Sequence, residues 1–344
     1  MRNLFVVHSQ NNLILASGLA NNDFKSDIND LILFRDFKPS ENLDIRIKKC
    51  FSSVKIIEGI WDKPRGSIKD KLKRSDADCK EIKIFVSKTK YHRLFIVDDA
   101  CVQEMFLMKL THKNNPGIEM AWLEDGAYPY FTNDVPADGL GATPLRRLIR
   151  RIAVTVRYGL YGYYDLHRCM GIHKLLKKVY LTYPKYAREE YGGQERIEIS
   201  DQTFNTGMNI LYVGDIYEFE SGSILIALDK LDVYGEKLRE VDKLITQLVE
   251  KAHRENRKVY YKYHPRENDR LPALSNEVEL NRSVALEGYL VNSTTRDMTV
   301  IGIKSTSLQT AKKMGYNVCS YIQLLEPENI AVLNFYNNIE ITCM

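Results

Sequence analysis

Two adjacent carboxylates and a glycine, Glu124, Asp125 and Gly126, follow residues 118–123, a run typical of a buried strand. Neighbouring carboxylates resist being ionised together, so the pKa of one is raised and that group is suited to act as a general base. Gly126 allows the backbone to turn sharply or to approach a ligand closely. A plain acidic turn is the alternative interpretation, because Asp-Gly is a common turn pair.

A histidine, His264, follows a second strand-like run, and Pro265 then fixes the chain direction. An imidazole titrates near neutral pH, so it can donate a proton to a departing phosphate. Lys262 lies two residues before it and could supply positive charge. A surface histidine in a basic turn is the alternative interpretation.

Hydroxyl side chains gather between a strand-like and a helix-like run, at Ser305, Thr306 and Ser307. The start of a helix presents backbone N–H groups without partners, so hydroxyls at that point complete a ready anion site. A simple helix cap is the alternative. All three groups of residues stand at strand exits, where ligands of open α/β sheets bind.

The elements that must position these groups alternate between β and α along most of the chain. Strands are expected at residues 3–7, 30–34, 82–86, 93–97, 118–123, 223–228, 258–265, 298–303 and 317–322, with a strand or strand edge at 284–291. Long helices are expected at 234–256 and 326–339. Continuous apolar strands are typical of parallel sheets covered on both faces, and the alternation predicts a doubly wound α/β fold.

Composition narrows the class of protein. A chain of 344 residues suits two domains. Its six cysteines are scattered without metal-ligand spacing, which favours a reducing compartment and neither disulfides nor zinc. No apolar run approaches a signal-peptide core or a membrane span, so a cytoplasmic location is expected.

Residues 143–186 interrupt the alternation with basic character, predicted as helices over 144–164 and 166–187. Eleven Arg and Lys face only three acids between Leu145 and Glu190. The cluster Arg146, Arg147, Arg150 and Arg151 could bind an anionic glycan or a membrane surface, whereas a solvated helix face is the plain alternative. No nucleic-acid-binding signature accompanies the charge, so no nucleic acid partner is expected.

Taken in order, Glu124-Asp125-Gly126, His264-Pro265 and Ser305-Thr306-Ser307 resemble the motifs of the bacterial sialyltransferases. The nearest groups are the capsular polysialyltransferases and the lipooligosaccharide sialyltransferases. The opening "VVHSQNNLILASGLA" is similar to that of the latter group, although the proline of their loop is missing and only Gln10 is kept.

The resemblance implies an α/β fold of the GT-B class, with two Rossmann-like domains facing a cleft. Residues 1–208 would form the acceptor-side domain, which carries the base and includes a basic helical insertion at about 143–190. Residues 209–325 would bind the CMP-sugar donor, and residues 326–344 would form a C-terminal helix.

The chemistry implied is inverting transfer of sialic acid from CMP-sialic acid, without a metal or other cofactor, in capsule or lipooligosaccharide biosynthesis. Glu124 or Asp125 would deprotonate the acceptor, and His264 would protonate the phosphate of departing CMP. The residues that would bind the donor are Gly126, Lys262, Pro265, Ser305, Thr306 and Ser307. Some relatives take the base from a helix, where Asp242 is the corresponding candidate.

Two alternatives stay open. The donor could be another activated sugar, such as CMP-Kdo or a CDP-polyol, or the chain could be a catalytically silent relative that binds glycan. The expected partners are a nucleotide-sugar donor and a glycan or glycolipid acceptor, with peripheral contact at the inner face of the cytoplasmic membrane.

Overall fold

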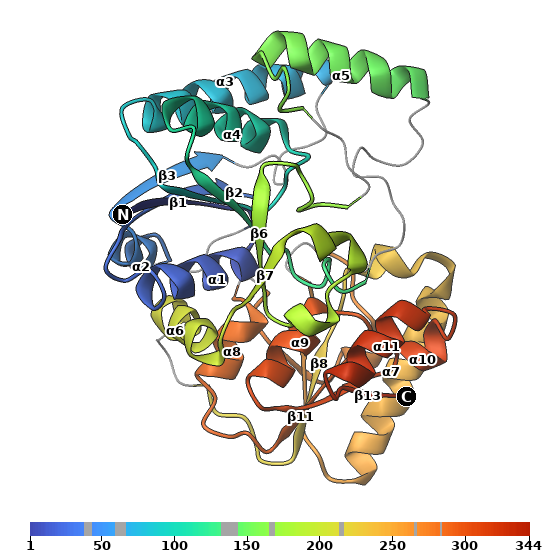
Figure 1. Ribbon diagram of the computed structural model, residues 1–344. Coiled ribbons are helices and arrows are strands. Elements are labelled where there is room, and N and C mark those ends of the chain that lie inside the picture. The colour runs from blue at the N-terminus through green and yellow to red at the C-terminus, as the bar shows by residue number, and fades with distance from the viewer. Residues whose placement is uncertain are drawn as a thin grey trace. The chain divides into compact units, whose positions relative to one another are not determined.

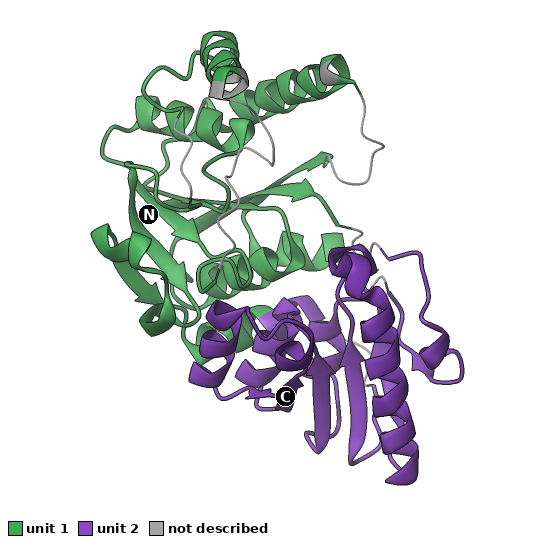
Figure 2. Ribbon diagram, turned by 90° about the vertical axis from the view of Figure 1, so that its right-hand side faces the viewer, with its two compact units in different colours: residues 1–37, 42–207 green, residues 38–41, 208–344 purple. Residues whose placement is uncertain are grey.

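The structure is a computed structural model that describes residues 1–37, 43–58, 67–131, 144–164, 169–212, 217–264, 267–282 and 284–344. Side chains are described throughout these ranges except at positions 68, 144, 146, 147 and 150. The chain divides into two compact units (Figure 2). Unit 1 comprises residues 1–37 and 42–207, and unit 2 comprises residues 38–41 and 208–344.

Unit 1 is built on a parallel sheet of seven strands in the order β3-β2-β1-β4-β5-β6-β7. Its strands are β1 (Arg2–Val7), β2 (Ile28–Arg35), β3 (Ser53–Glu58), β4 (Arg93–Ile96), β5 (Glu119–Leu123), β6 (Leu176–Leu181) and β7 (Glu195–Glu198). The chain builds outward from β1 to β3 and then resumes on the other side of β1 at β4. The strand order therefore reverses between β1 and β4, the kind of position where open α/β sheets bind ligands.

Helices cover both faces of this sheet (Figure 1). The helices of unit 1 are α1 (Gln10–Asn21), α2 (Leu43–Cys50), α3 (Ile68–Val86), α4 (Val102–Asn114) and α5 (Pro144–Tyr158), with α6 (Asp201–Tyr212) crossing into unit 2. Alternate strand residues such as Leu4 and Val6 pack with Ile82 of α3 and Met108 of α4 in one buried core. The strands can be apolar on both faces because helices exclude water from each.

Trp122 on β5 lies at the centre of that core and is fully buried. Its ring stacks on Tyr191 with the centroids 5.5 Å apart, and its indole N–H donates to the carbonyl of Val97 (2.8 Å). A buried indole needs such an acceptor, so Val97, just beyond the end of β4, is held against β5.

Unit 2 contains a parallel sheet of six strands in the order β10-β9-β8-β11-β12-β13. Its strands are β8 (Ser223–Ala227), β9 (Val259–Lys262), β10 (Val278–Glu279), β11 (Met298–Gly302), β12 (Asn317–Ser320) and β13 (Thr342–Cys343). Its helices are α7 (Leu238–Arg254), α8 (Leu286–Val291), α9 (Thr306–Lys313), α10 (Ile322–Leu325) and α11 (Ile330–Asn338). The order reverses between β8 and β11, so the expected α/β class with parallel sheets is confirmed in both units.

The strand expected at 82–86 is wrong, because these residues form the last turns of α3. Ile82, Phe85 and Val86 lie on one side of the helix and pack into the core, which is the spacing of a helical face. Ser67 begins the helix with a capping box in which its hydroxyl and the Asp70 carboxylate satisfy each other's backbone N–H groups.

The basic helix expected over 166–187 is also wrong, because β6 runs through its centre. Lys178 on β6 pairs with Glu119 of β5 (3.0 Å) and Glu195 of β7 (3.6 Å), so its charge is balanced across the sheet. The strand or strand edge expected at 284–291 is helix α8. The helix of 144–164 is confirmed as α5, which ends at Tyr158.

No helix in the described part of the chain is both long enough and apolar enough to cross a membrane.

Helix α1 packs closely against the part of α6 that belongs to unit 1. A Cβ atom on Gly207 would lie 2.0 Å from the Ile14 carbonyl oxygen, and one on Gly18 would lie 2.2 Å from the Thr203 carbonyl oxygen. These contacts are with backbone atoms, which cannot move aside as a flexible side chain would.

We therefore expect Gly207→Ala to lower the free energy of unfolding by about 1–3 kcal/mol, because α6 must shift to admit the methyl group. Chemical denaturation followed by circular dichroism measures this change. Gly192→Ala is the matched control, since a Cβ there meets nothing within 4 Å. Equal stability of the two variants would contradict the close packing of α1 and α6.

Candidate functional site

The carboxyl edge of the unit 1 sheet carries charged side chains after four of its strands. His8 follows β1, Asp36 follows β2, Asp98 lies just beyond β4, and Glu124 and Asp125 follow β5. Parallel strands bring these exits to one edge of the sheet. The sequence singled out only the last pair.

Glu124 is saturated by hydrogen bonds. Its side chain is buried and accepts from the Thr182 backbone N–H (2.7 Å), the Thr182 hydroxyl and the Tyr130 hydroxyl. The Tyr130 oxygen in turn accepts from the Tyr183 backbone N–H (2.9 Å). Through these hydrogen bonds Glu124 joins the ends of β5 and β6.

Asp125, half-buried, has a different setting. Its carboxylate accepts one hydrogen bond from the Asn12 side-chain amide (3.1 Å), which also donates to the Glu124 carbonyl (2.9 Å). Burial raises the pKa of Asp125, against the opposing effects of the Asn12 amide and the positive charge of His8. Gly126 has φ +57°, so the turn after Asp125 uses the left-handed conformation that favours glycine.

His8 was missed by the sequence prediction, although it is the first residue after a buried strand. Its Nδ1 lies 2.9 Å from Asp36 Oδ2, its Nε2 lies 2.9 Å from Glu104 Oε1, and its ring stacks on Phe34. Burial disfavours the charged imidazole, but the two carboxylates outweigh it and raise the pKa of His8 to about 10. His8 is therefore an imidazolium at neutral pH.

Glu104, on α4, is fully buried and also accepts from the backbone N–H groups of Val97 (2.9 Å) and Asp98 (3.0 Å). Asp98 itself is half-buried. Burial, together with the negative charge of Glu104, raises the pKa of Asp98 to about 7. Asp98 thus becomes a second candidate for proton transfer at this edge, and the signal in the sequence was its position after the strand at 93–97.

Asp99, the neighbour of Asp98, has a structural role. Its buried carboxylate accepts from the backbone N–H groups of Gly171 (3.0 Å) and His173 (2.9 Å). It therefore anchors the loop before β6 and is committed to that loop, as Glu124 is to the end of β6.

In unit 2, Lys262 and His264 occupy the end of β9. Lys262 is buried, and burial lowers its pKa to about 8 against the opposing charge of Glu287. His264 is half-buried, and its carbonyl accepts from the Glu267 N–H (2.9 Å). Pro265 lies outside the described residues.

Ser305, Thr306 and Ser307 stand at the start of α9, as predicted. Ser305 is the N-cap, and its hydroxyl accepts from the Ser307 N–H (3.4 Å). The Ser307 hydroxyl lies 3.5 Å from Glu287 Oε1 on α8. Glu287, which the sequence prediction missed, has its pKa raised by burial, against the opposing effects of Lys262 and Ser307.

Glu287 thus links two groups of predicted residues, one at the end of β9 and one at the start of α9. The reversal point of the sheet lies between them at the end of β8. There, Asp229 accepts from the Tyr234 hydroxyl (2.5 Å) and the Lys304 N–H (3.3 Å), and burial raises its pKa.

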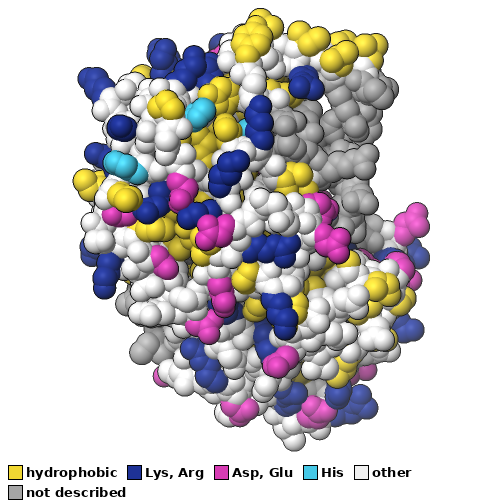
Figure 3. All heavy atoms as spheres, viewed as in Figure 1, with side chains coloured by type: hydrophobic (Ala, Val, Ile, Leu, Met, Phe, Trp, Pro, Cys, Tyr) yellow, Lys and Arg dark blue, Asp and Glu magenta, His cyan; other side chains and the backbone are white. Residues whose placement is uncertain are grey.

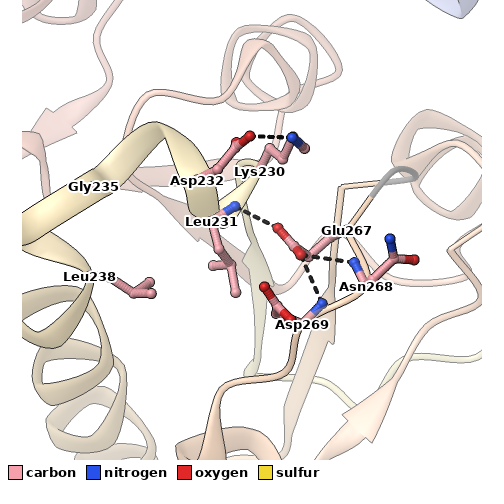
Figure 4. A pocket seen from close by; sticks show the side chains of 8 residues that line it. All are labelled: Lys230, Leu231, Asp232, Gly235, Leu238, Glu267, Asn268 and Asp269. Atoms are coloured by element: carbon pink, nitrogen blue, oxygen red, sulfur yellow. Dashed lines mark hydrogen bonds and ion pairs between the residues drawn. The ribbon is translucent and has the colours of Figure 1, made fainter. Parts of the chain in front are cut away.

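A pocket of about 380 Å³ opens beside the β8 and β9 exits. Its lining comprises Lys230, Leu231, Asp232, Gly235, Leu238, Glu267, Asn268 and Asp269. Figure 4 shows the Glu267 carboxylate between two loops, accepting from the N–H of Leu231 (2.6 Å) and those of Asn268 and Asp269 (2.8 Å each). Glu267 therefore ties the segment after β8 to residues 268 and 269.

The remaining predicted residues do not join these groups. Asp242 is a half-buried residue of α7, in unit 2. Arg151 is exposed on α5, whereas the side chains of Arg146, Arg147 and Arg150 lie outside the described residues. Within the described ranges, no three His, Cys, Asp or Glu side chains are arranged to hold a metal ion.

Comparison with sequence models of protein families shows the family to which the chain belongs. The sequence model of the alpha-2,8-polysialyltransferase family matches residues 3–318, nearly the whole chain and all three predicted motifs. The chain belongs to this family. The predicted membership of the bacterial sialyltransferase superfamily is thereby confirmed, and the protein is a glycosyltransferase of the sialyltransferase type. A search of curated proteins gives no match.

Solved structures of the same fold come from several sugar-nucleotide enzymes. An alpha/beta-galactoside alpha-2,3-sialyltransferase from the luminous marine bacterium Photobacterium phosphoreum is 10% identical, with a TM-score of 0.53 over 99% of this chain and 98% of that one. A UDP-GlcNAc 2-epimerase from Neisseria meningitidis is 12% identical, with a TM-score of 0.52 over 99% and 92%. The epimerase of Methanocaldococcus jannaschii is 11% identical, with a TM-score of 0.54 over 96% and 86%. These likenesses confirm the GT-B class of fold.

The His8 ion pairs predict a specific pH dependence of stability. Folding raises the pKa of His8 from 6.5 to about 10, so the folded state binds its proton more tightly than the unfolded state. The stabilisation is therefore full below pH 6.5 and is lost as the pH rises toward 10. We expect the difference in unfolding free energy between wild type and His8→Gln to shrink steadily across that range.

Urea denaturation at pH 6, 8 and 10 measures this difference. His253→Gln, which removes an exposed histidine of α7 whose Nε2 lies 3.1 Å from Glu277 Oε1, controls for the loss of a histidine–carboxylate pair at the surface. A difference between wild type and His8→Gln that stays constant from pH 6 to 10 would rule out a protonated His8.

Proposed function

We propose that this protein transfers sialic acid from CMP-sialic acid to a glycan acceptor, with inversion at the anomeric carbon. The observation that carries the proposal is the family match over residues 3–318, which spans the acidic, histidine and hydroxyl motifs. Each motif stands at a strand exit of a parallel sheet, the position at which α/β folds present reactive groups. Capsule or lipooligosaccharide biosynthesis is the setting that we propose for it.

We assign the base to Asp125 rather than to Glu124. Glu124 is held by the hydroxyls of Tyr130 and Thr182 and by a backbone N–H, so its carboxylate is committed to hydrogen bonds within the fold. Asp125 has a raised pKa, which makes it a better proton acceptor for a sugar hydroxyl. Asp98 is the second candidate, because its pKa of about 7 is also suited to proton transfer.

The leaving CMP carries its negative charge on a phosphate, which the groups of unit 2 are suited to bind. His264 donates a proton or hydrogen bond to that phosphate, and the start of α9 offers the hydroxyls of Ser305, Thr306 and Ser307. Lys262 and Glu287 complete the donor site, the latter as an acceptor for sugar hydroxyls. These groups supply leaving-group stabilisation without a metal, so we propose a metal-independent reaction.

A donor other than CMP-sialic acid is the second candidate function. The phosphate-binding groups of unit 2 suit any CMP-activated sugar, and CMP-Kdo is the comparison donor. A silent glycan-binding relative is the third, and it would release no CMP from any donor. Peripheral contact with the inner face of the cytoplasmic membrane is also proposed.

The test is CMP release from CMP-sialic acid by the purified protein, with and without galactosides or oligosialic acid, in EDTA. We expect acceptor-stimulated release that EDTA does not reduce. Asp125→Asn and His264→Ala should each lower kcat by about 10²-fold or more, because each removes a proton-transfer group. Release of CMP from CMP-Kdo alone would make CMP-Kdo the donor. No release of CMP from any donor would refute the proposed transferase activity.

The choice of base has its own test. Because the base must be ionised, kcat/KM should fall with decreasing pH through an apparent pKa above the ordinary aspartate value of about 4. Asp125→Asn should abolish this limb, whereas Glu124→Gln should chiefly lower stability and Asp98→Asn should keep most activity. If Asp125→Asn is active and a folded Glu124→Gln or Asp98→Asn variant shows no turnover, the residue replaced in the inactive variant is the base.

A further inference from the structure

Helix α5 presents an apolar stripe to solvent. Its members are Leu145, Leu148, Ile149, Ile152 and Val156, each between 53% and 65% exposed. Their spacing of three and four residues places them on one side of the helix. In Figure 3 a row of hydrophobic side chains lies along the upper edge of the molecule, where Figure 1 shows α5.

The opposite side of α5 is already used to attach the helix to unit 1. Val154 and Tyr158 pack with Cys79 of α3 and Met105 of α4 in a separate buried cluster. The Tyr158 hydroxyl donates to Asp76 of α3 (3.0 Å). The helix is therefore seated by one face, and the exposed stripe is a second face without a role in that core.

The charge of α5 indicates which kind of surface its exposed face binds. Residues 144–158 include five arginines and no acid. Arg146 and Arg150 occupy helix positions along one flank of the stripe, and Arg151 lies beyond its other flank. Arg157 is paired with Asp76 of α3, so its charge is already balanced within unit 1. A second copy of the chain would bring two acid-free, arginine-rich helices together, and their like charges would repel. An anionic lipid surface satisfies both the arginines and the apolar stripe.

We propose that α5 docks unit 1 on an anionic membrane surface, with its five-residue apolar stripe inserted at the boundary between headgroups and acyl chains. The arginines on the flanks contact lipid phosphates. This binding surface is independent of the residues assigned to catalysis. It explains why an exposed helix carries apolar residues at the positions where solvated helices carry polar ones.

Sedimentation with sucrose-loaded vesicles tests the proposal. We expect the full-length protein to bind vesicles of phosphatidylcholine with one-quarter phosphatidylglycerol, and to bind pure phosphatidylcholine vesicles weakly. The double variant Ile149→Ser with Ile152→Ser should bind the anionic vesicles at least about tenfold more weakly, because two inserted side chains are lost. High NaCl should weaken wild-type binding, since it screens the arginines.

The matched control is Ile84→Ser with Ile330→Ser, which also removes two exposed isoleucines, 68% and 58% exposed, from α3 and α11. This control should bind like wild type. Circular dichroism and thermal melting check that both double variants are folded. The double variant Arg146→Gln with Arg150→Gln is a second test, because it leaves the apolar stripe intact. It should reduce only the preference for anionic vesicles over phosphatidylcholine vesicles.

Three outcomes would overturn the proposal. They are no wild-type binding to anionic vesicles, equal loss of binding in the two isoleucine double variants, and undiminished binding by folded Ile149→Ser with Ile152→Ser. Light scattering after size exclusion tests whether a second copy of the chain, and not a membrane, covers the apolar stripe. A wild-type dimer that becomes a monomer only in the Ile149→Ser, Ile152→Ser variant, without vesicle binding by wild type, would make α5 a contact between copies.

Discussion

The imidazolium of His8, enclosed by the carboxylates of Asp36 and Glu104, is the interaction on which the carboxyl edge of unit 1 depends. It joins the exits of β1 and β2 to α4, and Glu104 extends the link to the backbone beyond β4. These exits lie on either side of the point where strand order reverses. Removal of one member would leave a buried charge without compensation, which is among the most costly changes in a protein interior.

The two carboxyl edges differ in chemical character. The edge of unit 1 gathers the carboxylates of Asp98, Glu124 and Asp125, of which Glu124 is committed to hydrogen bonds within the fold. The edge of unit 2 presents Lys262 and the hydroxyls at the start of α9, beside the carboxylates of Asp229 and Glu287. Carboxylates suit the removal of a proton, and cationic and hydroxyl groups suit the binding of an anion. This difference in chemistry is the basis of the two roles that we propose for the edges, proton removal at the first and phosphate binding at the second.

The sequence predicted those parts of the fold whose pattern is local. Continuous apolar runs became buried strands at 3–7, 93–97 and 298–303, and the motif residues stand at strand exits as expected. The errors arose where local pattern was ambiguous. Residues 82–86 are apolar enough for a strand but belong to a helix begun by Ser67, and β6 was hidden because Lys178 is balanced by acids on neighbouring strands.

The candidate site was predictable only as far as residue type allows. Sequence could not separate Glu124 from Asp125, because the difference lies in the hydrogen bonds that Thr182 and Tyr130 donate to Glu124. His8 and Glu104 are 96 positions apart in the chain, so nothing local predicts that they pair. Glu287 escaped notice for the same reason, since α8 brings it to Ser307 of the next helix.

Both tryptophans of the sequence, Trp61 and Trp122, precede the last residue of unit 1. Trp122 is enclosed by Tyr191 and hydrogen-bonded to Val97 beside the reversal of strand order. The emission of Trp122 therefore reports on the core around the first sheet, whereas the aromatic residues of unit 2 are tyrosine and phenylalanine. A tryptophan placed in unit 2 by substitution of one of its tyrosines or phenylalanines would give that unit an indole reporter of its own.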